Sequence, residues 1–274
     1  MGFPLSAYLA RIGVDRVKST LKANLPTLAL VMASQSRAIA FENLSVVQRE
    51  TISIDPADII NKLIDCGRGG YCFEQNMLLQ DALREIGFEV VPLLCRVRWN
   101  KTADQETPFT HMALKVKLDD GRKYLADVGF GGTNSIAPLQ LGKDSEPQQQ
   151  PEGLFRTITD SAGFNTLQWE IKGEWRALYM FNAEQTCLFS DLEQSNWWSC
   201  TYPKARFTTS LFVSRVIGEE RHHILDSTYV ARRADGTADT VVIADLGQLT
   251  GLLTTVFGLK ITNSAGLDRY LKRE

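Results

Sequence analysis

The spacing of hydrophobic residues changes once along the chain, and this change limits the folds that are possible. Up to Ile86, apolar residues recur every three to four positions, which is typical of helices that bury one face. From Val90 onwards, short runs of β-branched and aromatic residues indicate strands instead. Helices followed by strands, without regular alternation, favour an α+β fold over a doubly wound parallel sheet.

Start and stop signals define two helices in the first third. Asp55 and Pro56 predict an N-cap followed by proline at the first helical position, and Gly67 can end that helix. A second helix is expected over residues 72–86, with Gly87 as its stop.

The rest of the chain divides into a β-rich middle and a mixed α/β end. Together with the helical start, this predicts three regions, residues 1–87, 88–195 and 196–274. Strands are predicted at 90–94, 112–118, 124–128, 167–171, 177–181, 211–217, 224–231 and 240–243, and helices from Asp245 and from Ser264. Residues 142–153, rich in Gln, Pro and Gly, predict a solvated loop.

Charge and composition are those of an ordinary globular protein. The 274 residues include 30 Lys and Arg against 32 Asp and Glu, and no basic block is present, so nucleic acid is not expected as a partner. The start carries no secretory signal, and its longest uncharged run, residues 23–36, is shorter than the roughly 20 residues that span a bilayer. We therefore expect a cytoplasmic protein without a membrane partner.

The cysteines form no CxxC pair, which is typical of a reducing compartment. They stand at positions 66, 72, 95, 187 and 200. Four of the five are expected to be small buried hydrophobes, and one needs a different explanation. His222 and His223 are predicted to lie in a solvated turn without a third ligand at metal spacing, so no metal is expected.

One predicted hairpin has a register that matters for the chemistry. Its three-residue turn ends at Gly121, which can take the left-handed position without steric cost. In that register Leu114 faces Ala126, and His111 becomes the diagonal neighbour of Asp127 on the same face. The hairpin therefore predicts that an imidazole and a carboxylate lie within side-chain reach.

Cys72 opens a helix directly after a Gly–Gly turn, where unpaired N–H groups and the helix dipole stabilise a thiolate. With His111 as its partner and Asp127 orienting the ring, the three residues would form an activated nucleophile. The alternative is structural: a buried filler at Cys72, a hydrogen-bonded core residue at His111, and a cap of the Gly129 turn at Asp127. The residues alone do not bring Cys72 to the other two.

Several motifs resemble those of the arylamine N-acetyltransferase family. They are Phe41-Glu42-Asn43-Leu44, Arg68-Gly69-Gly70-Tyr71-Cys72-Phe73-Glu74-Gln75-Asn76, Thr110-His111, Asp127-Val128-Gly129-Phe130-Gly131, and Asn196-Trp197-Trp198 with Phe207. The match covers most of the chain, is dense before residue 132 and is sparse afterwards. The length resembles that of bacterial-type members. The resemblance implies a helical first region, an antiparallel β-barrel-like middle and an α/β lid, with a triad arranged as in cysteine peptidases.

By this resemblance, Cys72 is expected to be the acetyl-accepting nucleophile, His111 its imidazolium partner and Asp127 the orienting carboxylate. Acetyl-CoA would acetylate the cysteine in a ping-pong reaction, and an arylamine, arylhydrazine or N-hydroxyarylamine would then take the acetyl group. The backbone N–H of Cys72 is a candidate donor to the oxyanion.

The resemblance also implies where both substrates bind. The coenzyme would contact Thr110, Gly129, Phe130, Gly131 and Gly132. The aromatic acceptor would lie in an apolar slot formed by Phe41, Val97, Phe130 and Phe207. Glu42 and Arg68 could form a buried ion pair that supports the Gly–Gly turn, or remain two exposed charges.

Two other readings of the function stay open. Another Cys–His–Asp enzyme, such as a papain-like or transglutaminase-like amidase or a synthase that closes macrocyclic amides, would use the same triad. A binding module that keeps the scaffold without activity would not need a reactive Cys72. Ser45, where the family often has Asp, and residues 140–155, which match no family motif, leave donor and acceptor preference open.

Overall fold

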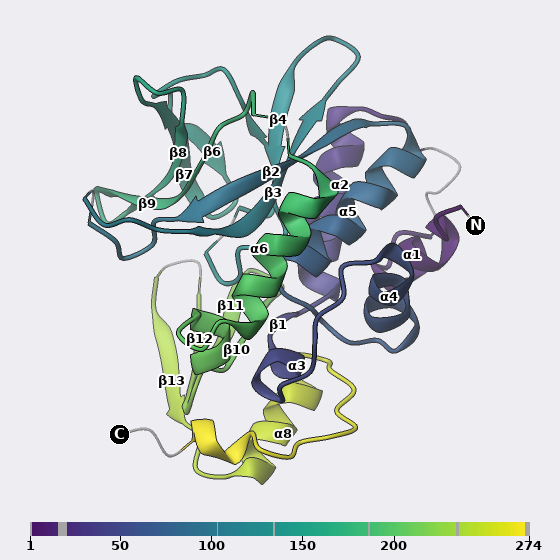
Figure 1. Ribbon diagram of the computed structural model, residues 1–274, viewed down its shortest axis with the longest axis vertical. Helices are drawn as coiled ribbons and strands as arrows, with labels where there is room; N and C mark the ends of the chain where they lie inside the picture. The colour runs from purple at the N-terminus through teal and green to yellow at the C-terminus, as the bar shows by residue number, and fades with distance from the viewer. Residues whose placement is uncertain are drawn as a thin grey trace.

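Helices form the first third of the chain in the computed structural model (Figure 1). The structure describes residues 2–15, 21–102, 104–133, 135–185, 187–233 and 236–271. The elements of this third are α1 (Leu5–Arg11), α2 (Leu25–Ala38), the short strand β1 (Phe41–Glu42), α3 (Leu44–Val47), α4 (Pro56–Ile60), the π-helical turn η2 (Asn61–Asp65) and α5 (Cys72–Ile86). Among the described residues, no helix combines the length and apolar character needed to cross a membrane.

Local residues set the helix boundaries in this region, although the predicted N-cap Asp55 makes no side-chain capping hydrogen bond. Asn24 caps α2, because its side chain accepts a hydrogen bond from the backbone N–H of Thr27. α4 begins at Pro56, and α5 has the predicted bounds with Gly87 ending it at a φ of 109°. The last turn of the helix before Gly67 also differs from expectation, since it is wound as the π-helical turn η2.

The middle of the chain forms one antiparallel sheet that curls into a nearly closed barrel (Figure 1). Its strands are β2 (Glu89–Val97), β3 (Phe109–Lys117), β4 (Lys123–Ala126), β5 (Leu139–Gln140), β6 (Gln148–Gln150), β7 (Gly153–Thr159), β8 (Asn165–Ile171) and β9 (Glu174–Phe181). Within the described ranges they lie in the order β5-β4-β3-β2-β9-β8-β7-β6.

The two edge strands of this sheet meet through one side chain. The Gln148 amide donates to the backbone carbonyl of Gln140 (2.8 Å), and its oxygen accepts from the backbone N–H of the same residue (2.9 Å). Gln148 therefore closes the barrel where a backbone ladder would otherwise be needed.

The β3–β4 hairpin has the predicted register. Leu114 lies opposite Ala126, and Gly121 adopts a positive φ of 83° in the turn. The face that carries Leu114 packs with α5 into the core shared by helices and barrel. His111 lies on the opposite face, since successive side chains alternate along a strand.

The last third adds a second sheet, which we call the lid sheet, and a helix packed on it (Figure 1). Its elements are α6 (Phe189–Thr201), α7 (Arg206–Thr209), β10 (Phe212–Ile217), β11 (Glu220–Leu225), β12 (Thr228–Arg232), β13 (Ala238–Val242), α8 (Leu246–Thr255) and the 3₁₀ turn η3 (Asp268–Tyr270). In the part that the structure describes, the strand order is β1-β10-β11-β12-β13, so β1 of the helical third forms an edge of the lid sheet. The predicted N-cap Asp245 is confirmed, because its side chain accepts from the N–H of Gln248.

Three backbone predictions are wrong. Residues 224–231 form two strands and not one, because Asp226 turns the chain with a φ of 51°, a conformation that aspartate tolerates. The helix predicted from Ser264 is only the turn η3, which follows Gly266 in the left-handed region. The predicted loop at 142–153 contains strand β6, which pairs with β7.

The predictions for two side-chain types also need correction. His222 and His223 lie on β11 and not in a turn; His222 is 9 % exposed, and its Nδ1 lies 2.8 Å from the Tyr229 hydroxyl. Cys95 and Cys200 are buried as expected, whereas Cys66 is exposed and Cys187 is half-buried.

Candidate active site

Two glycines allow the chain to turn tightly just before α5. A Cβ on Gly69 would lie 2.2 Å from the carbonyl oxygen of Ala40, which is backbone and cannot move aside. A Cβ on Gly70 would lie 2.8 Å from the Glu74 carboxylate. The Gly–Gly pair is therefore required by the close approach of β1 and α5.

Two ion pairs hold this turn. Arg68 donates to Glu42 Oε1 from Nε (3.0 Å) and from Nη2 (2.8 Å), so the predicted pair forms. Glu74 caps α5 by accepting the N–H of Tyr71 (3.0 Å), and its other oxygen lies 2.6 Å from Lys62 Nζ. Burial lowers the pKa of Lys62, but the Glu74 and Glu42 carboxylates together raise it by more, so the amine stays charged.

Cys72 is the first residue of α5 and is 2 % exposed. Its Sγ lies 3.7 Å from the carbonyl oxygen of Thr110 on β3. Burial raises the pKa of its thiol above the ordinary value; the backbone N–H groups of Met112 and Phe73 lower it, and the Asp127 carboxylate raises it. The net direction is opposite to the stable thiolate expected from the helix start, because desolvation outweighs the N–H groups. We therefore expect ionisation of this thiol to need a base close to it.

A 2.7 Å hydrogen bond joins His111 Nε2 to Asp127 Oδ2 in the barrel wall. Both residues are buried, at 2 % and 5 % exposure. Burial raises the pKa of Asp127, but the charge and hydrogen bond of His111, with hydrogen bonds from Asn76 and the Gly129 N–H, hold it below its usual range. This bond leaves Nδ1 of His111 able to exchange a proton. Within the described residues, the Cys72 thiol makes no hydrogen bond to His111.

Asn76 links the nucleophile helix to the carboxylate, a role that sequence reasoning missed. It lies one turn after Cys72 and donates to Asp127 Oδ1 (2.9 Å) and to the Met112 carbonyl (2.6 Å). Its own oxygen accepts the N–H of Val128 (3.0 Å). The spacing from Cys72 on a helix was available in the sequence, but the position of Asp127 above that turn was not.

Tyr179 of β9 also contacts the site and was missed. Its ring centroid lies 4.8 Å from that of His111 and 5.0 Å from that of Phe130, and the residue is fully buried. Burial and the Asp127 carboxylate raise the pKa of its hydroxyl, which therefore stays neutral. The strand was predicted, but its pairing with β2 joins distant segments and has no local signal.

The four residues predicted for the acceptor slot fall into two groups. Phe130 packs edge-on against His111, with centroids 5.0 Å apart, and Val97 lies opposite Tyr179 on the neighbouring strand. Phe41 and Phe207 contact each other at 5.8 Å. Gly131 connects the groups, since a Cβ on it would lie 3.9 Å from the Phe41 ring.

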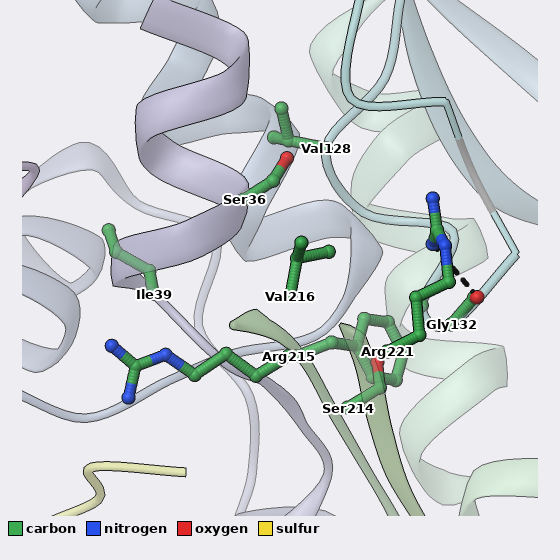
Figure 2. Close-up of a pocket in the computed structure, with 10 residues that line it drawn as sticks. Ser36, Ile39, Val128, Gly132, Ser214, Arg215, Val216 and Arg221 are labelled. Atoms are coloured by element: carbon green, nitrogen blue, oxygen red, sulfur yellow. Dashed lines mark hydrogen bonds between the residues drawn. The ribbon is translucent and has the colours of Figure 1, made fainter. Parts of the chain in front are cut away.

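The glycine cluster after Asp127 lies directly against α5. A Cβ on Gly129 would lie 2.8 Å from the Cα of Cys72. Between this cluster, α2 and the lid sheet is a cavity of about 20 Å³, whose lining includes Gly132, Ser214 and Arg221 (Figure 2). A cavity of this size holds about one water molecule. Two of the predicted coenzyme residues, Thr110 and Gly129, therefore adjoin Cys72.

A larger pocket, of about 730 Å³, lies beside α6 and is lined in part by Arg96, Arg98 and Trp198. It includes none of the predicted site residues. In the described part of the chain, no three His, Cys, Asp or Glu side chains gather as a metal site.

Comparison with known proteins gives one consistent answer. A sequence profile of the N-acetyltransferase family matches residues 24–265. The chain is 34% identical to an arylamine N-acetyltransferase of Mycolicibacterium smegmatis, over 98% of this chain and 96% of the relative. It is also 34% identical to an arylamine N-acetyltransferase / N-hydroxyarylamine O-acetyltransferase of Salmonella typhimurium, over 94% and 90%. The solved Mycobacterium marinum arylamine N-acetyltransferase in complex with CoA superposes with a TM-score of 0.90 at 29% identity, over 97% and 98%.

Proposed function

The chain belongs to the N-acetyltransferase family, and from this we propose that it transfers an acetyl group from acetyl-CoA to aromatic amines. The proposed acceptors are arylamines, arylhydrazines and N-hydroxyarylamines. Support comes from relatives named for arylamine and N-hydroxyarylamine substrates and from a related structure that contains CoA.

The buried His111–Asp127 hydrogen bond is the observation that carries this proposal. It joins β3 to the residue that follows β4, and Cys72 Sγ lies 3.7 Å from the carbonyl of the residue before His111. A buried thiol, an imidazole and a charged carboxylate in this order are the parts that covalent acyl transfer needs.

Acylation begins with the proton of Cys72 Sγ passing to Nδ1 of His111. Asp127 holds the ring in position and stabilises the imidazolium that forms. The thiolate attacks the acetyl carbonyl carbon, and the Cys72 N–H, in the first turn of α5, donates to the oxyanion. The bond between the carbonyl carbon and the CoA sulfur breaks, and the imidazolium returns its proton to the leaving thiolate.

Deacylation uses the same groups in the second half of the cycle. The amine nitrogen attacks the acetyl carbon of the thioester while His111 takes a proton from it. The bond to Cys72 Sγ then breaks, the amide leaves, and the imidazolium returns the proton to the Cys72 thiolate. The two steps together replace one direct transfer of the acetyl group, and each step has a lower barrier than that transfer.

We assign the donor to Thr110, Gly129, Phe130, Gly131 and Gly132, and the aromatic acceptor to Phe41, Val97, Phe130 and Phe207. The support is position: Gly129 adjoins Cys72, and Phe130 packs against the imidazole.

We also propose that the protein acts in the cytoplasm. Every cysteine is free in the described part of the chain, including exposed Cys66, which fits a reducing compartment.

Two-substrate kinetics test the proposed route. A covalent acetyl-cysteine predicts parallel double-reciprocal plots when acetyl-CoA is varied at several fixed concentrations of an arylamine. Intersecting plots would mean that both substrates bind together, and would remove the intermediate from the mechanism.

A further inference from the structure

Arg221 of β11 reaches from the lid sheet to the glycine cluster. Its Nη1 donates to the carbonyl oxygen of Gly132 at 2.9 Å (Figure 2), and its Nη2 lies 3.2 Å from Glu152 Oε1. The side chains of the ion pair are only 12 % and 9 % exposed. One guanidinium thus connects the lid sheet, the glycine cluster and the segment before β7.

Glu152 also contacts Ile136, which lies four positions after Gly132 in the chain. Its Oε1 also accepts the backbone N–H of Ile136 at 3.4 Å. Its own backbone is fixed by the indole N–H of Trp169, which donates to the Glu152 carbonyl at 3.2 Å. The Arg221–Glu152 pair therefore contacts both Gly132 and Ile136.

The energetics of the pair favour a positional role over a stabilising one. Burial lowers the pKa of Arg221, and the Glu152 carboxylate raises it. Removing two charges from water offsets most of the attraction between them. In addition, Glu152 Oε2 is buried and has no hydrogen-bond partner among the described residues. Such a pair fixes geometry at little net gain in folding free energy.

The segment that the pair holds continues from the catalytic residues. It follows Phe130, whose ring packs 5.0 Å from His111, and Gly131, whose Cβ position lies 3.6 Å from Ser214 Oγ on the lid sheet. A shift of Gly132 would therefore be passed to Phe130 through a single intervening residue.

We propose that Arg221 and Glu152 are positioning residues that hold Gly132 and Ile136, and with them Phe130, in the conformation that accepts the acyl donor. The effect on the KM for acetyl-CoA rests on the proposed function, whereas the effect on the structure does not. It also gives a role to residues 140–155, which match no family motif and which supply Glu152.

Steady-state kinetics provide the first test. Arg221→Gln removes the guanidinium that contacts Gly132 and Glu152, and we expect the KM for acetyl-CoA to rise about tenfold while kcat stays within about twofold. Arg221→Lys keeps one compact donor group, so its KM for acetyl-CoA should lie between that of the wild type and that of Arg221→Gln. Arg176→Gln is the matched control, because that arginine is exposed and pairs only at the surface with Glu174.

Hydrogen exchange resolved to the Ile136 amide provides the second test. Arg221→Gln and Glu152→Ala should both increase its exchange rate, and Arg176→Gln should not. Unchanged exchange at Ile136, or a KM for acetyl-CoA within about twofold of the wild type in both variants, would overturn the proposal. If the wild type fails to turn over acetyl-CoA, the proposed function fails, and the Ile136 amide still decides this inference. Should Arg221→Gln not fold, Glu152→Ala and Arg221→Lys carry both measurements.

Discussion

Asp127 is the residue on which the chemistry of the site depends. It is buried yet charged, because His111, Asn76 and the N–H of Gly129 all stabilise the carboxylate. This buried charge orients the imidazole and stabilises the imidazolium that forms during the reaction. Burial raises the pKa of the Cys72 thiol, so we expect its reactivity to depend on that imidazole.

Replacing this carboxylate with an amide should therefore abolish most of the activity. We expect Asp127→Asn to lower kcat about 10³–10⁴-fold, because the amide cannot stabilise the imidazolium or fix the tautomer. The rate of Cys72 alkylation by iodoacetamide at neutral pH should fall with it. An unaltered rate and pH profile would remove Asp127 from the mechanism.

The same residue predicts a pH dependence of stability. Its pKa in the folded protein lies below the ordinary value of 3.8, so the folded state favours the charged form. The resulting stabilisation is complete well above that value and is lost as pH falls through it toward the folded-state pKa. Urea unfolding should show the wild type losing more free energy of unfolding than Asp127→Asn between about pH 5 and about pH 2. Parallel losses would contradict this assignment.

The sequence predicts the His111–Asp127 contact but not the rest of the site. The contact follows from one hairpin register that Gly121 sets locally. Cys72, Asn76 and Tyr179 reach it through the packing of α5 on β3 and the pairing of β9 with β2, which depend on distant segments. No local pattern encodes those contacts, so the resemblance to a family had to supply the position of Cys72.

At the scale of elements, the turn before α5 aligns the nucleophile. Gly69 allows β1 and α5 to approach each other, and Arg68 and Glu74 fix the two ends of the turn.

Filling the space at Gly69 should disturb that alignment. We expect Gly69→Ala to lower the free energy of unfolding by about 1–3 kcal/mol, because its Cβ would overlap the Ala40 carbonyl. Turnover should fall as Cys72 shifts. Gly251→Ala is the matched control: its Cβ meets nothing within 4 Å in helix α8, and it should stabilise by about 0.5–1 kcal/mol. Equal stabilisation by both substitutions would contradict the tight turn.

Element boundaries were predictable where one residue decides them. Asn24, Gly87 and Asp245 act through their own backbone or side chain, and the helices start and stop there. Asp226 turns the chain without glycine or proline, so the hairpin β11–β12 gave no clear signal. Strand β6 consists of three glutamines and forms because it pairs with β7. Its own residues give no strand signal.

At the scale of the whole molecule, the barrel and the lid sheet enclose the site together. The barrel supplies His111 and Asp127, and Arg221 and β1 connect the lid sheet to the barrel and to the helices. The division at residues 87 and 195 stays a prediction. Position 195 falls within α6.

Barrel closure by a side chain gives a global prediction. Gln148→Ala removes both hydrogen bonds to the backbone of Gln140, and the free energy of unfolding should fall by about 1–2 kcal/mol with turnover unchanged. Gln149→Ala, whose amide bonds only to the neighbouring carbonyl, should change it by less than about 0.5 kcal/mol. Indistinguishable unfolding curves for the two variants would mean that Gln148 does not close the barrel.

The most direct test of the central claim is intact-protein mass spectrometry after incubation with acetyl-CoA and no amine. The account predicts one acetyl group on Cys72, its release when 4-methoxyaniline is added, and no adduct on the nearly isosteric Cys72→Ser. If iodoacetamide alkylates Cys72 readily but acetyl-CoA leaves no adduct, the nucleophile is competent and the donor is wrong. That result would contradict the proposed acetyl transfer.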